Sequence, residues 1–356
     1  MRFEEFYNFK ETLTQNFKNL VDLSFINPSS EIESPILRNF YDLLSKARLG
    51  YTPSVGLPDV RIACANFWKG VTNSNYSIDS FIPSYGTKDA LALFSRSMLL
   101  PHQKVFLMQP FYPVYYYHCL ANQLIPTTNV SEADAIVFSL PHNPTGTVFL
   151  DELSSLLNQV RLKPETPVFL DCVYAPLWTD EVRFLDELRT SARFLIESFS
   201  ISKCFGAGGV RTGFITGSKG ALQLLSRVRS RIDYSVSILN QHFLVSVLTS
   251  ANQIIDRLKH YFRHRRLIFD SFGLAHLTNS LSDLPFLWIK HEQISRKLFE
   301  HLAFNGFLTV WGGFYGEEWS NCLRISLTIP EVEIARFCQM LVSELNIKIT
   351  DEALNI

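Results

Sequence analysis

The sequence predicts an α/β protein, with a large domain built on a mainly parallel sheet covered by helices on both faces, and a smaller α+β domain. From about residue 80 to residue 218, short runs that are apolar on both faces alternate with helical patterns, as buried parallel strands and their crossover helices do. Residues 221–272 are helical in pattern, and short strand-like runs return after them. A chain of 356 residues is long enough for two such units.

The segment before the predicted sheet is mostly helical in pattern. Apolar residues recur at intervals of three to four, the spacing of an amphipathic helix, at Phe3, Phe6, Phe9, Leu13 and Phe17. Such an aromatic stripe is more typical of a core or a partner contact than of a cofactor site. Further helices are expected at about residues 36–47 and through residues 63–67, on either side of a loop at 50–57 that is rich in turn-forming residues.

Five short apolar runs are the clearest predicted strands of the large domain, at residues 104–108, 135–140, 167–171, 194–198 and 213–216. Ligands of parallel α/β sheets bind at the carboxyl ends of the strands. Polar or turn-forming loops follow four of these runs, at residues 110–113, 141–146, 171–174 and 200–203, and a fifth such loop, at 86–89, starts the helix before them. We therefore expect these five loops to converge on one edge of the sheet.

The carboxyl-terminal part of the chain predicts the smaller domain. Its strands are expected at residues 286–289, 307–310 and 323–327, with a helix at 331–345. A basic stretch at 260–266 is more typical of the solvated face of a long helix than of a site for an acidic partner. The expected division is residues 1–48 as a segment that packs with the small domain, 49–250 as the large domain and 251–356 as the small domain.

Composition argues against several classes of partner. The formal net charge is -1 and 19% of the residues are charged, so neither nucleic acid nor an anionic membrane is favoured. The six cysteines form no CxxC pair, which argues against a zinc site and favours a reducing compartment. The amino terminus lacks the pattern of a signal peptide, and no stretch approaches the roughly 18 apolar residues of a membrane span. We expect a cytoplasmic protein that binds a small molecule.

The most informative stretch is residues 198–213, which holds Lys203, Arg211 and four glycines. Glycines let the backbone approach a ligand closely, and an arginine can bind a phosphate with two parallel hydrogen bonds. An equally acceptable interpretation of the stretch alone is a surface turn before a strand. It matches neither a dinucleotide-binding fingerprint nor a P-loop.

A reactive lysine beside a phosphate site indicates pyridoxal 5′-phosphate, the common carbonyl cofactor that forms a Schiff base with lysine. Asp171, at a buried strand end, suits the ring nitrogen of that cofactor, because a carboxylate keeps this nitrogen protonated. Asn143 and Tyr174 are placed to bond the ring oxygen, and Tyr112 to stack on the ring. The phosphate would lie at a helix start, and its expected site is formed by Gly86, Thr87, Lys88, Ser200, Ser202 and Arg211.

Arg324 is an isolated charge within an apolar strand, so it needs a partner, and a substrate carboxylate is a natural one. Each of these residues also has an ordinary structural explanation. A buried strand-end Asp often caps a helix, an Asn-Pro pair is often a turn, and a strand Arg often pairs with a structural acid. Their joint occurrence in chain order favours the cofactor site.

The ordered motifs resemble the class I and II pyridoxal-phosphate aminotransferases of fold type I. They are Tyr51-x-Pro-x-x-Gly56, Gly86-Thr87, Pro110-x-Tyr112-Pro113, Asn143-Pro144-Thr145-Gly146, Asp171-x-x-Tyr174, Ser200-x-Ser202-Lys203, Arg211-x-Gly213 and Arg324. The resemblance implies a mainly parallel seven-stranded sheet and the cofactor contacts named above. It also implies that Lys203 is the Schiff-base lysine and proton shuttle, that Arg324 binds the substrate carboxylate, and that Tyr51 reaches the neighbouring active site of a homodimer.

The resemblance implies transfer of an amino group between an amino acid and a 2-oxo acid. Some motifs are closer to the histidinol-phosphate branch, and the substrate stays open. Asn27, with Asn143 and Arg324, is a candidate substrate contact, and Phe25, Ile26, Tyr115 and Phe314 are candidate pocket residues. The alternatives are a decarboxylase, lyase or oxidase that uses the same cofactor, and a ligand-sensing module like those of certain transcription regulators. The sensing module is less expected, since only about fifty residues precede Tyr51, without a basic recognition helix.

Overall fold

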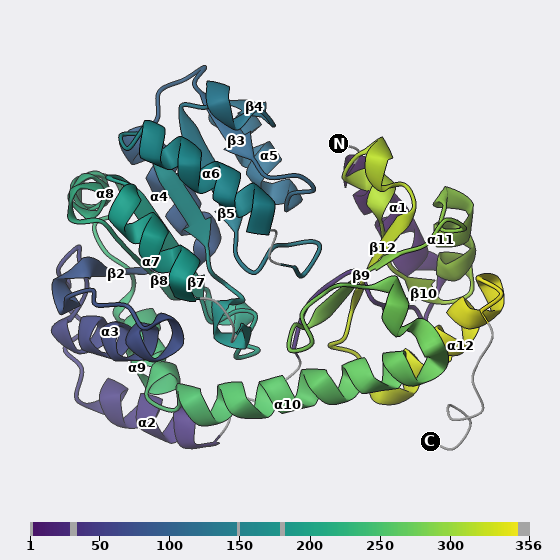
Figure 1. The fold of residues 1–356 in the computed structure, drawn as a ribbon. Coiled ribbons are helices and arrows are strands. Elements are labelled where there is room, and N and C mark those ends of the chain that lie inside the picture. Colours follow the sequence, from purple (N-terminus) through teal and green to yellow (C-terminus); the bar gives the residue numbers. More distant parts are fainter. Residues whose placement is uncertain (1–2, 29–33, 148–149, 179–181, 348–356) are drawn as a thin grey trace.

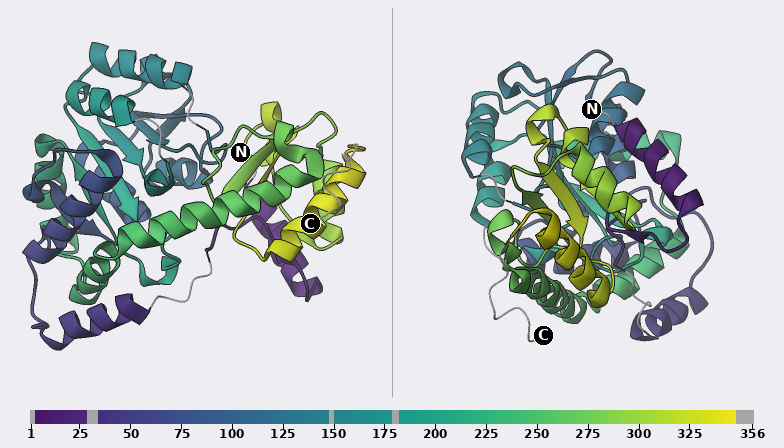
Figure 2. Two further views of the ribbon diagram at one scale, coloured as in Figure 1. Left: turned by 60° about the horizontal axis from the view of Figure 1, so that its bottom comes forward. Right: turned by 90° about the vertical axis from the view of Figure 1, so that its right-hand side faces the viewer.

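The structure is a computed structural model that describes residues 3–28, 34–147, 150–178 and 182–347. It shows a larger unit built on one broad sheet and a smaller unit built on short sheets, with helix α10 (Ala251–Phe269) running along both (Figures 1 and 2). The α/β architecture predicted from the sequence is confirmed.

The large sheet has seven strands in the order β2-β8-β7-β6-β5-β3-β4. They are β2 (Phe81–Ser84), β3 (Lys104–Leu107), β4 (Ile125–Thr127), β5 (Ala135–Ser139), β6 (Val168–Asp171), β7 (Leu195–Ser200) and β8 (Gly213–Gly217). Strand β8 is antiparallel to both of its neighbours, and the pairs among β7, β6, β5, β3 and β4 are parallel. The expected mainly parallel seven-stranded sheet is therefore confirmed, although β2 and β4 were not among the predicted strands.

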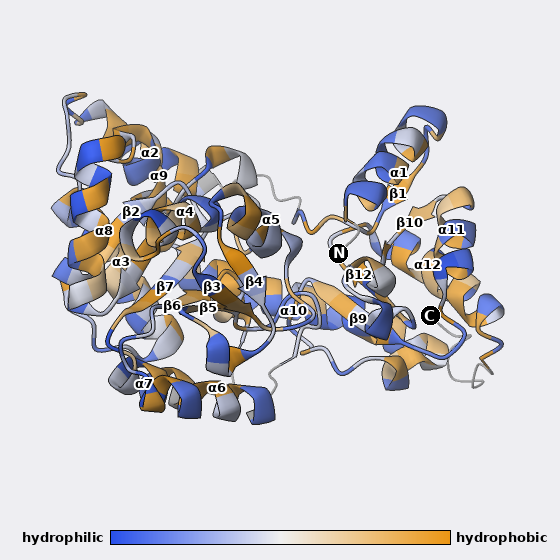
Figure 3. Ribbon diagram, turned by 90° about the horizontal axis from the view of Figure 1, so that it is seen from above, coloured by the Kyte–Doolittle hydropathy of each residue, from blue (hydrophilic) through white to orange (hydrophobic). Residues whose placement is uncertain are grey.

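Helices cover both faces of this sheet, because successive residues of its strands, which point to opposite faces, are apolar. On β5, Ile136 and Phe138 pack in one core cluster and Val137 packs in the other. Residues of α3 (Pro58–Thr72), α6 (Leu150–Leu162) and α7 (Val182–Ser191) join the first cluster, and those of α4 (Thr87–Met98), α5 (Pro113–Ala121) and α8 (Lys219–Ile232) join the second. Figure 3 shows the apolar strands between helices with hydrophilic outer faces.

The long helical region predicted at 221–272 is three helices, α8, α9 (Ile238–Leu248) and α10. Its basic stretch is paired within the chain. Arg263 bonds Asp283, Arg265 bonds Glu331, and Arg266 bonds Asp270. The stretch is therefore a helix face engaged with the chain's own acids.

The smaller unit contains a three-stranded antiparallel sheet in the order β11-β12-β9 and a two-stranded parallel sheet of β1 and β10. Its elements are β1 (Val21–Asp22), β9 (Phe286–Lys290), β10 (Phe307–Leu308), β11 (Val310–Trp311), β12 (Cys322–Ser326), α1 (Phe3–Asn16), α11 (Arg296–Phe304) and α12 (Glu331–Glu344). The single strand predicted at 307–310 is thus wrong, because the chain leaves one sheet after Leu308 and joins the other at Val310.

The aromatic stripe of α1 is a core contact. Phe3 and Phe6 are buried, and both rings pack against Phe314. Helix α2 (Ser34–Ser45), in contrast, packs on α9 beside the large sheet. The expected domain boundaries at residues 48 and 250 therefore stay a prediction.

Two further findings bear on the composition. All six cysteines are free and buried. In the described part of the chain, no helix combines the length and the apolar character that a membrane crossing requires.

A buried charge pair ties α7 to the large sheet. The carboxylate of Glu197 on β7 is fully buried and accepts hydrogen bonds from Nε and a terminal nitrogen of Arg189, at 2.9 and 2.8 Å. Trp68 and Tyr76 donate to the same carboxylate, at 2.9 and 2.6 Å. Every oxygen of this buried acid is thereby satisfied, and its charge is balanced by one arginine.

We expect Arg189→Met to lower the free energy of unfolding by about 3–5 kcal/mol, because it leaves a buried carboxylate without its counter-charge. Arg193→Met is the matched control, since the pair of Arg193 with Glu165 is exposed and exposed pairs contribute little. Urea unfolding followed by fluorescence would measure both. Equal, small losses in the two variants would contradict the structural role given to Arg189.

Candidate active site

The predicted site residues converge at the carboxyl edge of the large sheet. A cavity of about 630 Å³ lies there. Its lining includes twelve of the fourteen candidate residues, namely Asn27, Thr87, Lys88, Tyr112, Asn143, Asp171, Tyr174, Ser200, Ser202, Lys203, Arg211 and Arg324. The loops after β2, β5, β6 and β7 supply most of them, and the smaller unit supplies Arg324 from β12 and Asn27 from the segment after β1.

Lys203 lies in the turn after β7 and points its amine into this cavity. Its Nζ donates to the backbone oxygen of Ile26 at 2.5 Å and lies 4.7 Å from the ring centre of Phe25. Burial, together with the nearby positive charges of Arg324, Lys88 and Arg211, lowers the pKa of Lys203 to about 8, and Asp171 opposes this shift. The amine is therefore far more nucleophilic at neutral pH than an exposed lysine.

An anion site stands beside Lys203, at the start of α4. Gly86 precedes this helix with φ of +92°, and a Cβ atom there would come within 3.2 Å of Ser200 Oγ and 3.5 Å of a terminal nitrogen of Arg211. The Oγ of Ser202 lies 2.9 Å from that of Ser200. The buried Oγ1 of Thr87 has no hydrogen-bond partner, so it is a donor available to a ligand.

This arrangement fits a phosphate group. The first amides of α4 are free to bind an anion, and Arg211 and Lys88 supply positive charge. Arg211 adopts a left-handed conformation, with φ of +58°, that follows the short helix Gly208–Val210. Gly86 does not itself line the cavity, and its contribution is the close approach that its missing side chain permits.

Asp171, at the end of β6, is the buried carboxylate of the site. Its Oδ2 accepts a 2.8 Å hydrogen bond from the hydroxyl of Tyr115 on α5, and its Oδ1 accepts one from the amide of Val173. Burial raises the pKa of Asp171 to about 6, while the hydrogen bond from Tyr115 lowers it. Tyr115 was predicted only as a pocket residue. Its position three residues after Tyr112, at the start of a helix, was the one sequence feature that could have indicated its contact with Asp171.

Arg324 closes the other end of the cavity. One terminal nitrogen donates to Asn143 Oδ1 at 3.2 Å, the other donates to the backbone oxygen of Ser24 at 2.6 Å, and Nε has no partner. Because the Asn143 oxygen is engaged by Arg324, its amide NH₂ is left to donate to a ligand. The partners of Arg324 are neutral acceptors, so its charge stays available for a carboxylate.

Two aromatic residues complete the lining. Tyr112 precedes α5, its ring lies edge-on to that of Tyr115 at 5.5 Å, and burial raises its pKa to about 12. Tyr174 is buried with its ring against Phe286, and burial raises its pKa well above the ordinary value. Both hydroxyls are therefore neutral donors at physiological pH.

Two expected residues are placed elsewhere within this chain. Tyr51 is 92% exposed, packs edge-on against Tyr234 and does not line the cavity. Phe314 was expected in the pocket, which is wrong, because its ring is buried in the core of the smaller unit against α1 and Trp311. Phe25, Ile26 and Tyr115 do line the cavity.

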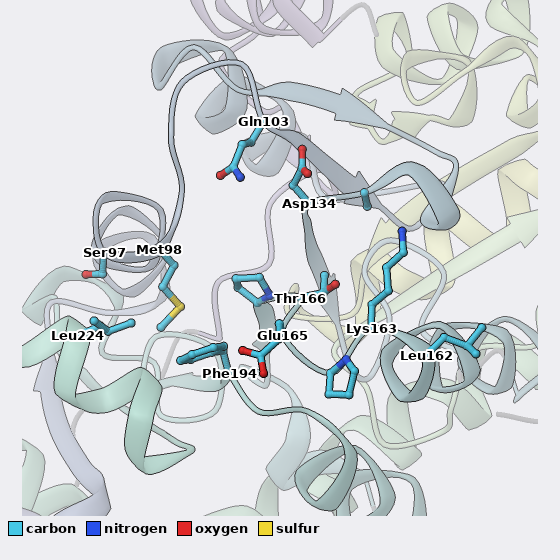
Figure 4. Close-up of a pocket in the computed structure, with 13 residues that line it drawn as sticks. Ser97, Met98, Gln103, Asp134, Leu162, Lys163, Glu165, Thr166, Phe194 and Leu224 are labelled. Atoms are coloured by element: carbon cyan, nitrogen blue, oxygen red, sulfur yellow. The ribbon is translucent and has the colours of Figure 1, made fainter.

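A second cavity, of about 760 Å³, lies at the opposite, amino edge of the strands (Figure 4). Its charged groups are already engaged. Asp134 accepts from the amide of Lys104, Lys163 donates to the backbone oxygen of Ser131, and Glu165 pairs with Arg193. Despite its size, this cavity therefore lacks the converging reactive groups of the first.

Comparisons with known proteins agree with the geometry. The family model "Aminotransferase class I and II" matches residues 29–341. A histidinol-phosphate aminotransferase of Staphylococcus haemolyticus is 24% identical over 304 residues, which is 80% of each chain. An uncharacterized HTH-type transcriptional regulator of Bacillus subtilis is 27% identical over 313 residues, which is 80% of this chain and 64% of that protein. This chain thus spans under two thirds of the length of that regulator.

The fold is also that of solved structures. A Thermus thermophilus aspartate aminotransferase superposes with a TM-score of 0.82 at 18% identity, over 94% of each chain. This similarity establishes the fold of the chain, and the residues of the cavity carry the argument about its chemistry.

We expect Tyr115→Phe to raise the pKa of Asp171 above about 6, because it removes a hydrogen bond to the ionised carboxylate. A raised carboxyl pKa favours the neutral acid, which pairs less well with a protonated ring nitrogen. Pyridoxal phosphate should therefore bind roughly tenfold more weakly. Carboxyl-carbon NMR of the cofactor-free protein and a fluorescence titration would measure the two effects, with Tyr116→Phe as the control, and an unchanged Asp171 pKa would refute the assigned contact.

We expect the cofactor-free protein to react with pyridoxal, which lacks the phosphate, at a rate that rises with pH through a midpoint near pH 8 and levels off above it. The amine reacts only when deprotonated, and the pKa of Lys203 is lowered to about 8. Arg324→Gln should move this midpoint upward, because it removes a neighbouring positive charge, whereas Arg227→Gln on the exposed face of α8 should not. A rate that still rises at pH 10 would show that Lys203 behaves as an ordinary lysine.

Proposed function

This chain belongs to the class I and II aminotransferase family, and we propose that it moves an amino group between an amino acid and a 2-oxo acid with pyridoxal 5′-phosphate bound at Lys203. One observation carries the proposal. Lys203, Asp171 and Arg324 line a single cavity together with the phosphate site at the start of α4. An amine, a carboxylate, an anion site and a free guanidinium are the groups that this chemistry requires.

The chain's own residues have separable tasks. Pyridoxal phosphate, when bound, supplies a carbonyl for the amino group and a ring that accepts electrons from the substrate Cα. Asp171 would hold the proton of the ring nitrogen, and Asn143 and Tyr174 would donate to the ring oxygen. Thr87, Ser200 and Arg211 would hold the phosphate. All of these residues line the cavity into which Lys203 projects.

The proton transfer is assigned to Lys203. Arg324 binds the substrate carboxylate, which fixes the orientation of Cα in the cavity. As a neutral amine, Lys203 Nζ would accept the proton from Cα and would donate it to the carbon that carried the cofactor's carbonyl. Phe25 and Ile26 lie against this amine and limit the access of water to it.

Transamination is favoured over the other reactions of this cofactor by the role of Arg324. A decarboxylase must release the carboxylate, whereas a buried arginine with neutral partners retains it. A lyase or an oxidase could share the site, and product analysis separates these reactions from amino-group transfer.

A homodimer is part of the proposal. Tyr51, Leu49 and Tyr234 are exposed apolar residues gathered beside the loop at residues 235–238. A second copy of the chain would cover them and bring Tyr51 to a neighbouring phosphate site. The six free cysteines support a cytoplasmic location.

A second candidate function is ligand sensing, since one relative is named as an HTH-type transcriptional regulator. A sensing module would keep the cofactor and its lysine but would not turn over. The presence of Lys203, Asp171 and Arg324 in one cavity is compatible with both functions, so turnover must be measured directly.

We expect the purified protein to convert its cofactor to the pyridoxamine form in a single turnover with a reactive amino acid and to release the matching 2-oxo acid. A panel of amino acids, followed by the cofactor spectrum and by product identity, provides the measurement. Lys203→Ala should lose the visible absorbance of lysine-bound cofactor and slow the conversion by at least about a thousandfold, with an unchanged far-ultraviolet circular dichroism spectrum.

Three results would contradict the proposal. Carbon dioxide or peroxide without the pyridoxamine form would indicate another reaction. A bound cofactor with no turnover of any amino acid would favour ligand sensing. An unchanged spectrum in Lys203→Ala would remove the central residue from the site.

A further inference from the structure

Tyr315 carries a buried hydroxyl that the proposed function does not yet use. The residue follows the short helix Gly312–Phe314 and is 4% exposed. Its hydroxyl oxygen is buried and has no hydrogen-bond partner. Buried hydroxyls are normally bonded, because an unmet bond costs free energy. A buried hydroxyl without a partner is therefore a candidate donor to a ligand.

The sheet of the smaller unit places Tyr315 beside Arg324. In the β12–β9 register, Arg324 is directly opposite Trp288, and directly opposed residues of an antiparallel pair project from the same face. The ring of Tyr315 lies edge-on to that of Trp288, with centroids 5.4 Å apart. On its other side, Phe3 of α1 packs edge-on at 4.8 Å. The ring of Tyr315 is therefore packed between Phe3 of α1 and Trp288, the residue of β9 that is directly opposite Arg324.

The electrostatic neighbourhood agrees with this placement. Burial raises the pKa of Tyr315, with a smaller opposite effect from the positive charge of Arg324. Tyr112 lines the cavity, and its pKa is also affected by both residues: Arg324 lowers it and Tyr315 raises it. The hydroxyl of Tyr315 is thus a neutral donor within electrostatic reach of Arg324, whose side chain lines the cavity.

Arg324 itself also has an unsatisfied buried donor. Its Nε is buried without a partner, while its terminal nitrogens bond Asn143 and Ser24. The Tyr315 hydroxyl and Arg324 Nε are thus two buried donors without partners, and one of them is charged. A carboxylate can accept about four hydrogen bonds on its two oxygens, so a single carboxylate can satisfy both donors.

We propose that the Tyr315 hydroxyl donates a hydrogen bond to the α-carboxylate that Arg324 binds, which makes Tyr315 a substrate-binding residue. The inference rests on the proposed function and deepens it. It assigns the contact to the part that every amino-acid and 2-oxo-acid substrate shares. Tyr315 should therefore set affinity for all substrates and leave the choice among side chains unchanged.

The test uses Tyr315→Phe in the cofactor-loaded protein, because this change removes the hydroxyl and keeps the ring that packs on Trp288 and Phe3. Propionate, an unreactive carboxylate, is titrated against the cofactor spectrum. We expect its Kd to rise about tenfold, as for a lost hydrogen bond to a charged group. L-Alanine should show a similar rise in half-saturating concentration, with its single-turnover rate at saturation changed less than about twofold.

Two controls separate this role from a loss of packing. Propylamine has no carboxylate, so its binding should be equal in the wild type and in Tyr315→Phe. Tyr261→Phe removes another tyrosine hydroxyl, on α10, where the ring lies under Arg265, and it should leave propionate binding unchanged. Thermal unfolding of each variant reports whether its fold is intact.

The outcomes are distinct. An unchanged Kd for propionate would overturn the proposal, and so would a loss confined to amino acids with polar side chains, which would place Tyr315 at the side-chain pocket. Weaker binding of propylamine to the same degree would assign the effect to packing and also overturn it. If the wild-type protein binds propionate but produces no pyridoxamine form, the proposed function fails, and the propionate comparison still decides the role of Tyr315.

Discussion

The guanidinium of Arg324 joins three parts of the chain that are far apart in sequence. From β12 of the smaller unit it donates to Asn143, in the loop after β5, and to the backbone oxygen of Ser24, in the segment after β1. A buried charge without partners is strongly unfavourable, so these contacts restrict how the smaller unit can sit on the edge of the large sheet. The substrate end of the cavity depends on this placement, because Arg324 and the segment at residues 24–27 form much of its wall.

The charged groups of the cavity explain the lowered pKa of Lys203, the proposed base. Three cations and burial lower the pKa of Lys203, and Asp171 is the acid that opposes them. An anion bound at Arg211 or Arg324 would offset the neighbouring positive charge and make Lys203 more basic. The amine is thus most easily deprotonated when the site is open to reaction with a carbonyl, and it gains proton affinity when a substrate carboxylate has arrived.

Much of the fold and site follows from local pattern. Strands buried on both faces, with polar loops at their carboxyl ends, predict both the sheet and the position of Lys203, Asp171 and Asn143. The division of 307–311 between two sheets does not follow, because short strands are set by tertiary pairing. Phe314 and Tyr315 are adjacent aromatics that are both buried and both pack against Phe3 of α1, an arrangement that only tertiary packing reveals. Tyr51 stays a prediction, since its expected role lies in a second subunit.

The sequence alone does not predict whether a buried arginine has a structural role or binds a ligand. The side chain of Arg189 is only 10% exposed and Arg229 is fully buried, so burial alone does not separate these two arginines from Arg324. The first two face Glu197 and Asp89, which neutralise them. Arg324 instead meets an amide oxygen and a backbone oxygen, which orient a cation without cancelling its charge. Lys203 is held in the same way by the backbone oxygen of Ile26. Neutral acceptors therefore keep both cations in position, and their charges remain to attract the anionic groups of the cofactor and the substrate.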